Sequence, residues 1–247
     1  MRKIMRSSIV AVFMLILSVS LCSAGGNDIN LQAMAQSEFE DLSKEVGLII
    51  SYIPLAPAVP LGVLGFDIGI EVTGARISSG SDFWKNAVAD NKPPDYVVLP
   101  KIHVQKGLPF GIDLGAIYAI APGTNISLYG GELKWAFMKG SIVSPAAAIR
   151  GSYTALAGVD DLDATTYGLD ASISKGFGPL TPYAGLGQVW IKTSENVNDT
   201  ILDLNDISTS ATKLFIGARL KLLLLGIVLQ ADFSDTQMYS ARANISF

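Results

Sequence analysis

The sequence has very little of the side-chain chemistry that most enzymes use. Its 247 residues include one cysteine, Cys22, and one histidine, His103. Cys22 lies in a segment that we expect to be removed on export, and the remaining chain then has no disulfide, thiol nucleophile or thiolate metal site. Lys and Arg number 18 against 22 Asp and Glu. This acidic balance argues against nucleic acid as a partner, because nucleic-acid binding needs a basic surface.

The sequence also lacks an apolar run long enough for a membrane-spanning helix, which needs about 20 residues. Residues 9–21 form a shorter run, and Leu220–Leu229 is interrupted by Lys221 and by Gly226 at an expected turn. Yet 49% of the residues are hydrophobic. High apolar content without a spanning helix is what a transmembrane β-barrel should show.

The N-terminus has the three parts of a secretory signal peptide. Three basic residues lie in the first six positions, residues 9–21 are apolar, and Cys22-Ser23-Ala24 is a small-residue cleavage site. We expect cleavage after Ala24, so residues 1–24 are assigned to the signal peptide. Alternatively, Cys22 could be the lipidated cysteine of a lipoprotein, but lipoprotein signals resemble each other in having a small residue directly before that cysteine, and Leu21 fits this poorly.

The last nine residues alternate strictly between an apolar and a polar face, which predicts a β-strand. The apolar face carries Tyr239, Ala241, Ala243, Ile245 and Phe247. With the export signal and the repeated strands described below, this terminal aromatic strand resembles the outer-membrane β-barrel proteins of Gram-negative bacteria. In that class the strand is read by the barrel-assembly machinery. The resemblance assigns this signal to Tyr239, Ile245 and Phe247, and it implies an outer-membrane location after export by a cleaved signal peptide.

The same period-two pattern recurs from residue 62 to the C-terminus. We count ten strands, an even number as bacterial barrels require, with eight or twelve as alternatives. Their expected ranges are 62–74, 96–105, 109–120, 126–138, 145–157, 164–175, 181–193, 211–222, 226–234 and 238–247. The predicted fold is all-β, a transmembrane antiparallel up-and-down barrel over residues 62–247. A soluble β-sandwich is the alternative that we weigh against it.

Residues 25–61 precede the barrel and contain one expected amphipathic helix. Ser37 and Glu40 have the spacing of a capping box, and apolar residues follow at helical intervals to Ile53. Gly47 and Pro54 limit its length. We expect a lid across the periplasmic mouth, with a plug or an interfacial helix as the functional alternative. A first strand beginning near Gly47 also stays open.

The connections and the aromatic residues set the orientation. With both termini periplasmic, the even connections are the short Gly/Pro turns and the odd ones, including 75–95 and 194–210, are the outer loops. Six tyrosines then form one outward belt near the outer ends: Tyr96, Tyr118, Tyr129, Tyr153, Tyr167 and Tyr239. Such girdles are typical of membrane-water interfaces.

The inward face carries charges of both signs. The expected acidic residues are Asp67, Glu71, Asp113, Glu132, Asp170 and Asp232, and the basic ones are Lys101, Lys134, Arg150, Lys192, Lys213, Arg219, Lys221 and Arg242. With His103 they are our candidates for a lumen or pore lining. Because open channels are typical of barrels with about 16 strands, ten strands with opposed charges indicate a salt-bridged interior or a narrow pore. Arg150 and Lys134 would line any path.

Catalysis and metal binding have weaker support. His103 is expected at the periplasmic side beside Asp113, whereas a lipid hydrolase would need its base near the outer surface with a nucleophile. No EF-hand spacing accompanies the acidic loop residues, so we expect no metal site and no cofactor. A divalent ion bridging to lipopolysaccharide stays possible there. In the first outer loop, Phe83 and Trp84 either contact a partner or pack back onto the rim.

The leading functional hypothesis is a narrow or gated channel for small solutes, with the solute unknown. The alternative is a closed structural or surface-interaction barrel that acts through its outer loops, and the third is a lipid-modifying enzyme using His103. The expected partners are outer-membrane lipid, lipopolysaccharide and the barrel-assembly machinery. Residues 61–73 and 107–119 also resemble an uncharacterised family of proteobacterial small-barrel proteins, which brings no established activity.

Overall fold

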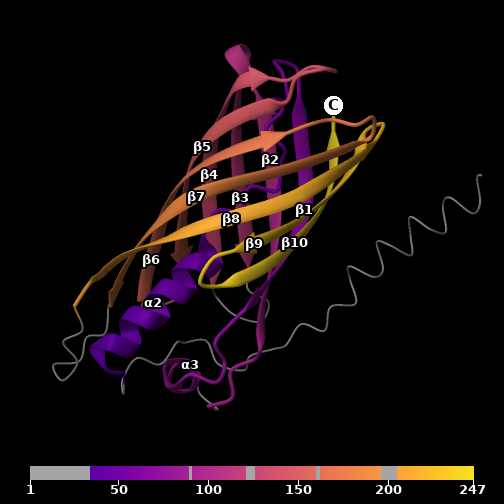
Figure 1. The fold of residues 1–247 in the computed structure, drawn as a ribbon. Helices are drawn as coiled ribbons and strands as arrows, with labels where there is room; N and C mark the ends of the chain where they lie inside the picture. Colours follow the sequence, from indigo (N-terminus) through magenta and orange to yellow (C-terminus); the bar gives the residue numbers. More distant parts are fainter. Residues whose placement is uncertain (1–33, 89–90, 121–125, 160–161, 196–204) are drawn as a thin grey trace, which may run out of the picture.

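The computed structural model describes residues 34–88, 91–120, 126–159, 162–195 and 205–247. Over these ranges the chain forms an antiparallel barrel with two short helices (Figure 1). The strands are β1 (Phe66–Arg76), β2 (Tyr96–Gly107), β3 (Ile112–Ile120), β4 (Ser127–Lys139), β5 (Ala146–Ala157), β6 (Leu162–Ser174), β7 (Leu180–Glu195), β8 (Ile207–Leu222), β9 (Leu225–Phe233) and β10 (Gln237–Ser246). The expected signal peptide lies outside the described residues.

The barrel closes because β1 pairs with β2 on one side and with β10 on the other. Ten strands are therefore confirmed, and a first strand near Gly47 is wrong, because that residue lies inside a helix. β1 also begins later than expected, at Phe66. Before it, Gly65 N–H donates to the carbonyl of Gly62 at 2.9 Å in a turn where Gly62 has φ +83°. Only glycine adopts that conformation without strain.

The strands alternate as the sequence predicts. In β1, Asp67 and Glu71 are 1% exposed and face the lumen, whereas Ile68 and Ile70 are about half exposed on the outside. The six tyrosines of the predicted belt are all on the outer face, between 38 and 51% exposed. Phe110, Phe137 and Phe247 also face outward near the opposite rim. The expected faces of these residues and the aromatic positions are confirmed; the exception among the predicted inward residues, Lys192, is described below.

The two rims differ in their connections. We call the rim with the four short turns between β2–β3, β4–β5, β6–β7 and β8–β9 the turn end, and the opposite rim the loop end. The C-terminus lies at the turn end, where Phe247 N–H donates to the Phe66 carbonyl at 3.0 Å. The first loop, between β1 and β2, contains the helix α3 (Asp82–Ala87). The four connections at the turn end are short as predicted, and the long connection 77–95 lies at the loop end, but the β9–β10 connection at the loop end, residues 234–236, is short as well.

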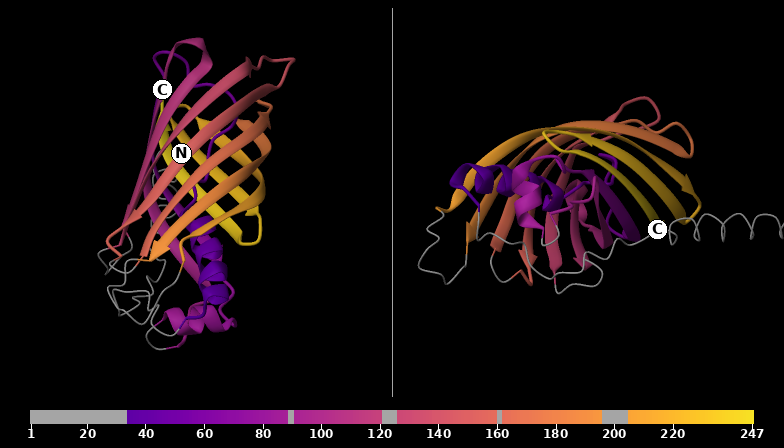
Figure 2. Two further views of the ribbon diagram at one scale, coloured as in Figure 1. Left: turned by 90° about the vertical axis from the view of Figure 1, so that its left-hand side faces the viewer. Right: turned by 90° about the horizontal axis from the view of Figure 1, so that it is seen from below.

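The N-terminal helix α2 (Gln36–Ile50) lies at the loop end, far from the C-terminus (Figures 1 and 2). It packs against the loop-end parts of β6, β7 and β8 and against α3. The expected lid is therefore wrong, because we predicted it over the mouth with the short turns and α2 lies at the opposite end. None of the helices in the described ranges has the length and apolarity that crossing a bilayer requires.

Two local features of α2 differ from the sequence reading. Its N-cap is Ala35, whose N–H donates to Glu38 Oε2 at 3.0 Å, so Ser37 and Glu40 do not form the predicted capping box. Gly47 does not end the helix either. A Cβ built on Gly47 would lie 2.3 Å from Ile191 Cγ2, so the glycine is required by the close approach of α2 to β7.

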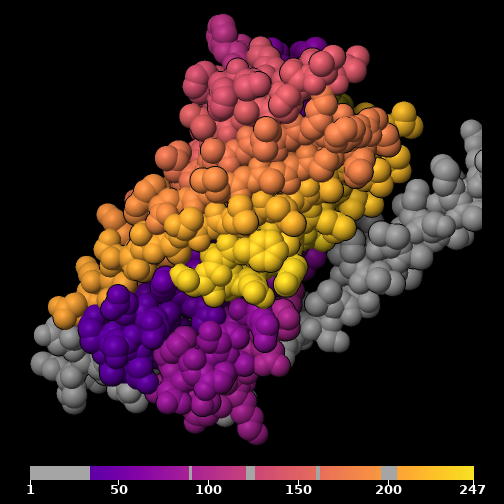
Figure 3. Space-filling view, viewed as in Figure 1, coloured from indigo at the N-terminus to yellow at the C-terminus, as the bar shows by residue number. Residues whose placement is uncertain are grey.

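The loop between β1 and β2 folds back onto α2, as Figure 3 shows from one side. Trp84 of α3 is 8% exposed and its Nε1–H donates to Glu45 Oε2 at 2.6 Å. Glu45 Oε1 also accepts from the Ser78 N–H at 2.9 Å. The packing-back alternative for Phe83 and Trp84 is thus confirmed, and α2 and α3 form one structured cap over the loop end.

Candidate functional site in the barrel lumen

A single extended segment, residues 51–61, runs from the end of α2 through the lumen to the turn before β1; we call it the plug. Its first eight residues are all buried. Tyr52 contacts opposite parts of the wall: its carbonyl accepts from Lys213 Nζ of β8 at 2.8 Å, and its hydroxyl is 3.0 Å from His103 Nε2 of β2. Because one residue touches both sides, the plug occupies the middle of the barrel.

The part of the plug nearest the turn end is held by β3 and β4. Lys134 Nζ donates to the carbonyls of Pro57 at 3.2 Å and Val59 at 3.1 Å. Leu61 N–H donates to both carboxylate oxygens of Asp113, at 3.1 and 3.2 Å. The plug forms no sheet ladder, so these charged side chains satisfy backbone groups that would otherwise be buried without partners.

The wall around the plug carries two ionic clusters, and the first centres on Glu71. Strand pairing places Glu71 directly opposite Lys101 on β2 and Arg242 on β10. Their charged atoms are 3.8 and 3.4 Å from the Glu71 carboxylate. Arg242 also lies 3.8 Å from Asp67. Cross-strand register thus places two cations beside one buried carboxylate.

The second cluster joins β3 to β6. Arg150 Nε is 2.6 Å from Glu132 Oε2, and its Nη1 is 3.6 Å from Asp170 Oδ1. On the neighbouring strands Lys134 lies 2.8 Å from Asp113. All five side chains are buried. Removing either charge of a pair would leave its partner unpaired in a low-dielectric interior, which is costly.

The structure brings most of the predicted lumen residues together. Asp67, Glu71, Lys101, His103, Asp113, Glu132, Lys134, Arg150, Asp170, Asp232 and Arg242 are buried inside the barrel. Asp232 accepts from Gln230 Nε2 at 2.9 Å, and Arg219 is half-buried near the turn end. Lys192 is a correction, because it is exposed on the outer face with Nζ 6.0 Å from the Tyr167 ring centre.

His103 is not placed for hydrolytic chemistry. It pairs with Ile117 across the sheet and not with Asp113, which pairs with Gly107, so the predicted neighbour is wrong. Its Nδ1 faces Arg242 Nη1, and its Nε2 faces the Tyr52 hydroxyl at 3.0 Å. Among the described residues, the polar contacts of His103 are carboxylates, Arg242 and Tyr52, with no Ser, Thr or Cys.

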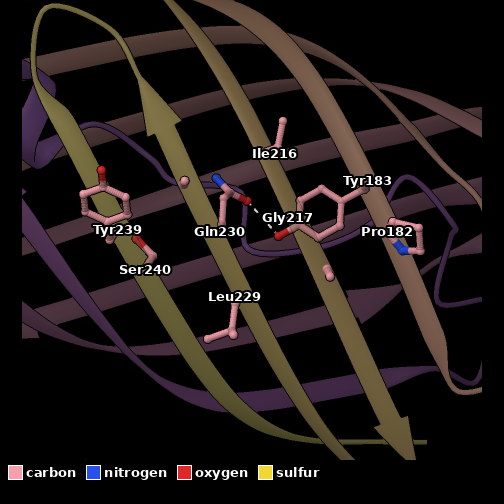
Figure 4. A pocket seen from close by; sticks show the side chains of 10 residues that line it. Pro182, Tyr183, Ile216, Gly217, Leu229, Gln230, Tyr239 and Ser240 are labelled. Carbon is pink, nitrogen blue, oxygen red and sulfur yellow. Dashed lines mark hydrogen bonds between the residues drawn. The ribbon is translucent and has the colours of Figure 1, made fainter.

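A tyrosine crosses the inner face of β8 in a place where only glycine fits. Figure 4 shows Tyr183 of β7 reaching over Gly217 toward Gln230 of β9, and its hydroxyl donates to Gln230 Oε1 at 2.8 Å. A Cβ on Gly217 would lie 2.4 Å from the Tyr183 ring. The shallow hollow of about 650 Å³ along β7 to β10 is lined by ten residues, none of them charged. It does not extend the ionic clusters.

The sequence reading missed an apolar lining in the loop half of the lumen. Val189, Ile191 and Ala211 point inward and pack against Leu48 of α2, and Phe215 is completely buried. A signal was present, because these strands contain runs that are apolar on both faces, such as Val189-Trp190-Ile191. Strands that are covered on both faces show such continuous runs.

Metal binding finds no support in the part of the chain that the structure describes. There, no group of three or more His, Cys, Asp or Glu side chains is arranged to hold a metal ion. Four of the acidic loop residues, Asp160, Asp161, Asp199 and Asp203, lie outside the described residues. The predicted absence of a cofactor stays a prediction.

No family model matches the chain, and no curated protein matches it. Among solved structures, the N-terminal β-barrel domain of Pseudomonas aeruginosa OprF is 13% identical with a TM-score of 0.36, covering 73% of this chain and 97% of that one. Ail of Yersinia pestis, in complex with the heparin analogue sucrose octasulfate, is 10% identical with a TM-score of 0.31, covering 74% and 97%. The NalP translocator domain from Neisseria meningitidis is 10% identical with a TM-score of 0.34, covering 85% and 96%. These low values carry no argument about activity or ligands.

Proposed function

We propose that this protein is an integral outer-membrane β-barrel that its own N-terminal segment seals, and that acts through the capped surface at its loop end. The observation that carries the proposal is the plug. Residues 51–58 are buried, and the wall holds the segment at Tyr52 in the middle and at Leu61 near the turn end. A barrel filled in this way leaves no continuous path for solutes.

The outer face of the wall supports the membrane location. Between the aromatic girdles the exposed side chains are large and apolar, for example Ile70, Leu133, Leu169, Leu214 and Leu229, each more than half exposed. Exposed apolar surface on this scale is costly in water but matches the apolar band of a transmembrane barrel. The terminal assembly signal and the cleaved signal peptide stay predictions that support the same location.

The cap of α2 and α3 supports a surface role at the loop end. Glu45 fixes both Trp84 and Ser78, and Lys44 reaches Asp235 in the loop between β9 and β10 at 2.7 Å. These contacts tie three loop-end segments into one defined surface. A defined outer surface on a sealed barrel suits recognition of a partner or of lipopolysaccharide better than permeation.

A gated channel is the second candidate, and the polar turn half of the lumen favours it. If the plug withdrew, the exposed wall would carry Glu71, Lys101, Glu132, Arg150 and Asp170, which is a wall that water and ions can wet. In this case the plug would be the gate, Lys134 would hold it in the closed state, and Arg150 and Lys134 would line the path once it withdrew.

Single-channel recording in planar bilayers separates the two candidates. The sealed barrel predicts no current steps from the folded wild-type protein and stable steps after deletion of residues 34–61. A gated channel predicts intermittent steps from the wild type as well. As a milder variant, Lys134→Ala removes the ammonium that holds Pro57 and Val59, and Lys85→Ala on α3 is the matched control. Long-lived open steps from the wild type would contradict the sealed barrel.

A further inference from the structure

The short turns at the turn end carry apolar side chains at their tips. Ile142 and Val143 in the turn between β4 and β5 are 96 and 89% exposed, and Leu223 in the turn between β8 and β9 is 93% exposed. Phe110, Phe177 and Leu64 occupy the same rim and are also more than 60% exposed. A turn that projects into water is normally polar, so a complete ring of apolar tips indicates a different environment.

Lysines accompany these tips and satisfy the backbone of the turns. Lys175 Nζ donates to the carbonyls of Ser141, Ile142 and Ser144 at 3.1, 2.6 and 3.3 Å. Lys106 Nζ donates in the same way to the Val63 carbonyl at 2.6 Å. Carbonyls in bulk water need no such partner, whereas carbonyls close to hydrocarbon must find one within the protein. The turns are thus built for surroundings that are poor in water.

The two rims also differ in charge. In the short turns and the strand ends next to them, all of which the structure describes, no Asp or Glu is exposed, whereas Lys139 is exposed and Lys106, Lys175 and Lys221 are partly exposed. Lys106 and Lys175 donate to turn carbonyls, and the contacts proposed below involve the other two, Lys139 and Lys221. The C-terminal carboxylate of Phe247 is the negative group on this rim. At the loop end the exposed acidic residues are Glu40, Asp41, Asp82, Asp95, Asp163, Asp206 and Asp235. The loop end also has the exposed cations Arg76, Lys92 and Lys192. One rim is therefore basic and apolar, and the other carries charges of both signs.

We propose that the turn end is a lipid-binding surface that inserts into the inner leaflet and binds the phosphates of anionic phospholipids. Its apolar tips continue the lipid-facing wall, since Leu222, Leu224 and Leu225 flank Leu223 and are also exposed. The apolar tips would lie among the acyl chains, and the side chains of Lys139 and Lys221 at the strand ends would extend along the rim so that their ammonium groups reach the headgroup phosphates. The proposal rests on the membrane barrel proposed above and adds the depth and the lipid class of one rim.

Fluorescence quenching of single labelled cysteines tests this depth. In the full chain with Cys22→Ser, an environment-sensitive label is placed at Ile142→Cys on the turn end, Leu133→Cys on the lipid-facing wall, or Glu40→Cys on the cap. Each protein is reconstituted into vesicles of phosphatidylcholine with or without phosphatidylglycerol. Brominated lipid quenches labels in the bilayer, and iodide quenches labels in water.

We expect the Ile142 label to behave like the Leu133 label, with quenching by brominated lipid and loss of quenching by iodide, while the Glu40 label shows the reverse. If iodide quenches the Ile142 label and brominated lipid quenches the Leu133 label, the barrel is in the membrane and the lipid-binding rim is overturned. If iodide quenches both labels, the membrane barrel itself fails.

The headgroup preference has its own test on the same vesicles. Phosphatidylglycerol should increase the protection of the Ile142 label from iodide, and Lys139→Gln with Lys221→Gln should remove that increase. Lys85→Gln at the loop end, where the lysine pairs with Asp82 at 3.1 Å, is the matched control and should leave it unchanged. Equal protection in neutral and anionic vesicles would overturn the anionic preference.

Discussion

The two halves of the lumen are filled by different chemistry. In the loop half, Phe39 and Leu42 of α2 are almost fully buried in an apolar cluster with the barrel wall. In the turn half, the plug is held by hydrogen bonds from charged side chains such as Lys134 and Asp113. Apolar burial gives most of the free energy but no direction, whereas hydrogen bonds to charged groups fix position. The helix α2 therefore anchors the plug, and the ionic wall sets the register of the plug in the lumen.

The apolar packing in the loop half of the lumen can be disrupted at Phe39, which has no exposed surface. Phe39→Ala removes a buried ring and leaves a cavity, so we expect a loss of about 3–5 kcal/mol in the free energy that holds α2 on the barrel. Hydrogen exchange of residues 39–61 in detergent micelles measures this opening. Leu133→Ala on the lipid-facing wall is the control, and equal exchange in both variants would contradict the anchoring role.

The polar half can be broken at Lys134. Lys134→Met leaves the buried Asp113 without its cation and the Pro57 and Val59 carbonyls without a donor, so we expect a loss of about 3–5 kcal/mol. Adding Asp113→Asn should restore part of that loss, because the uncompensated charge is then gone. Urea unfolding of the wild type and of the single and double variants measures both effects. If the double variant were less stable than Lys134→Met, the charge explanation would be wrong.

The close contact between α2 and β7 can be tested at Gly47. Gly47→Ala places a methyl group against Ile191, 2.3 Å from its Cγ2. We expect a net loss of stability of about 1–3 kcal/mol from overpacking, despite the better helix propensity of alanine. Ile191→Ala is destabilising by itself because Ile191 is buried, but in that background Gly47→Ala should cause little further loss. Thermal unfolding of the single and double variants measures the coupling, and additive losses would show that the two residues do not compete for space.

Tyr52 lies where the two halves of the lumen meet, and loss of its hydroxyl should have the smallest effect on stability. Tyr52→Phe keeps the ring but loses the hydroxyl contact to His103, which we expect to cost about 1 kcal/mol. The imidazole signals of His103, the single histidine of the chain, report the change directly by NMR. Unchanged signals would place the hydroxyl elsewhere in the folded protein.

The sequence correctly predicted which residues face the lumen where their neighbours are polar. The prediction failed in the part of the wall that α2 covers. Glu71, Arg150 and Arg242 were assigned correctly because burying a charge outside the lumen would be too costly. Lys192 was assigned inward by the same reasoning, but at that level Ile191 occupies the inner face because α2 covers it. The charge pattern alone does not indicate which half of the lumen contains α2.

The ten strands, most of their faces and the tyrosine belt could be predicted from the local side-chain pattern, because side-chain alternation is a local property of extended backbone. The position of α2 and the route of the plug could not, because they depend on long-range contacts. The eleven residues of the plug can extend to at most about 36 Å, enough to cross the barrel in either direction. The residues that α2 and the plug contact lie on strands distant in sequence. The rim at which α2 lies therefore depends on contacts with Ile191, Lys213 and Lys134, which no local pattern specifies.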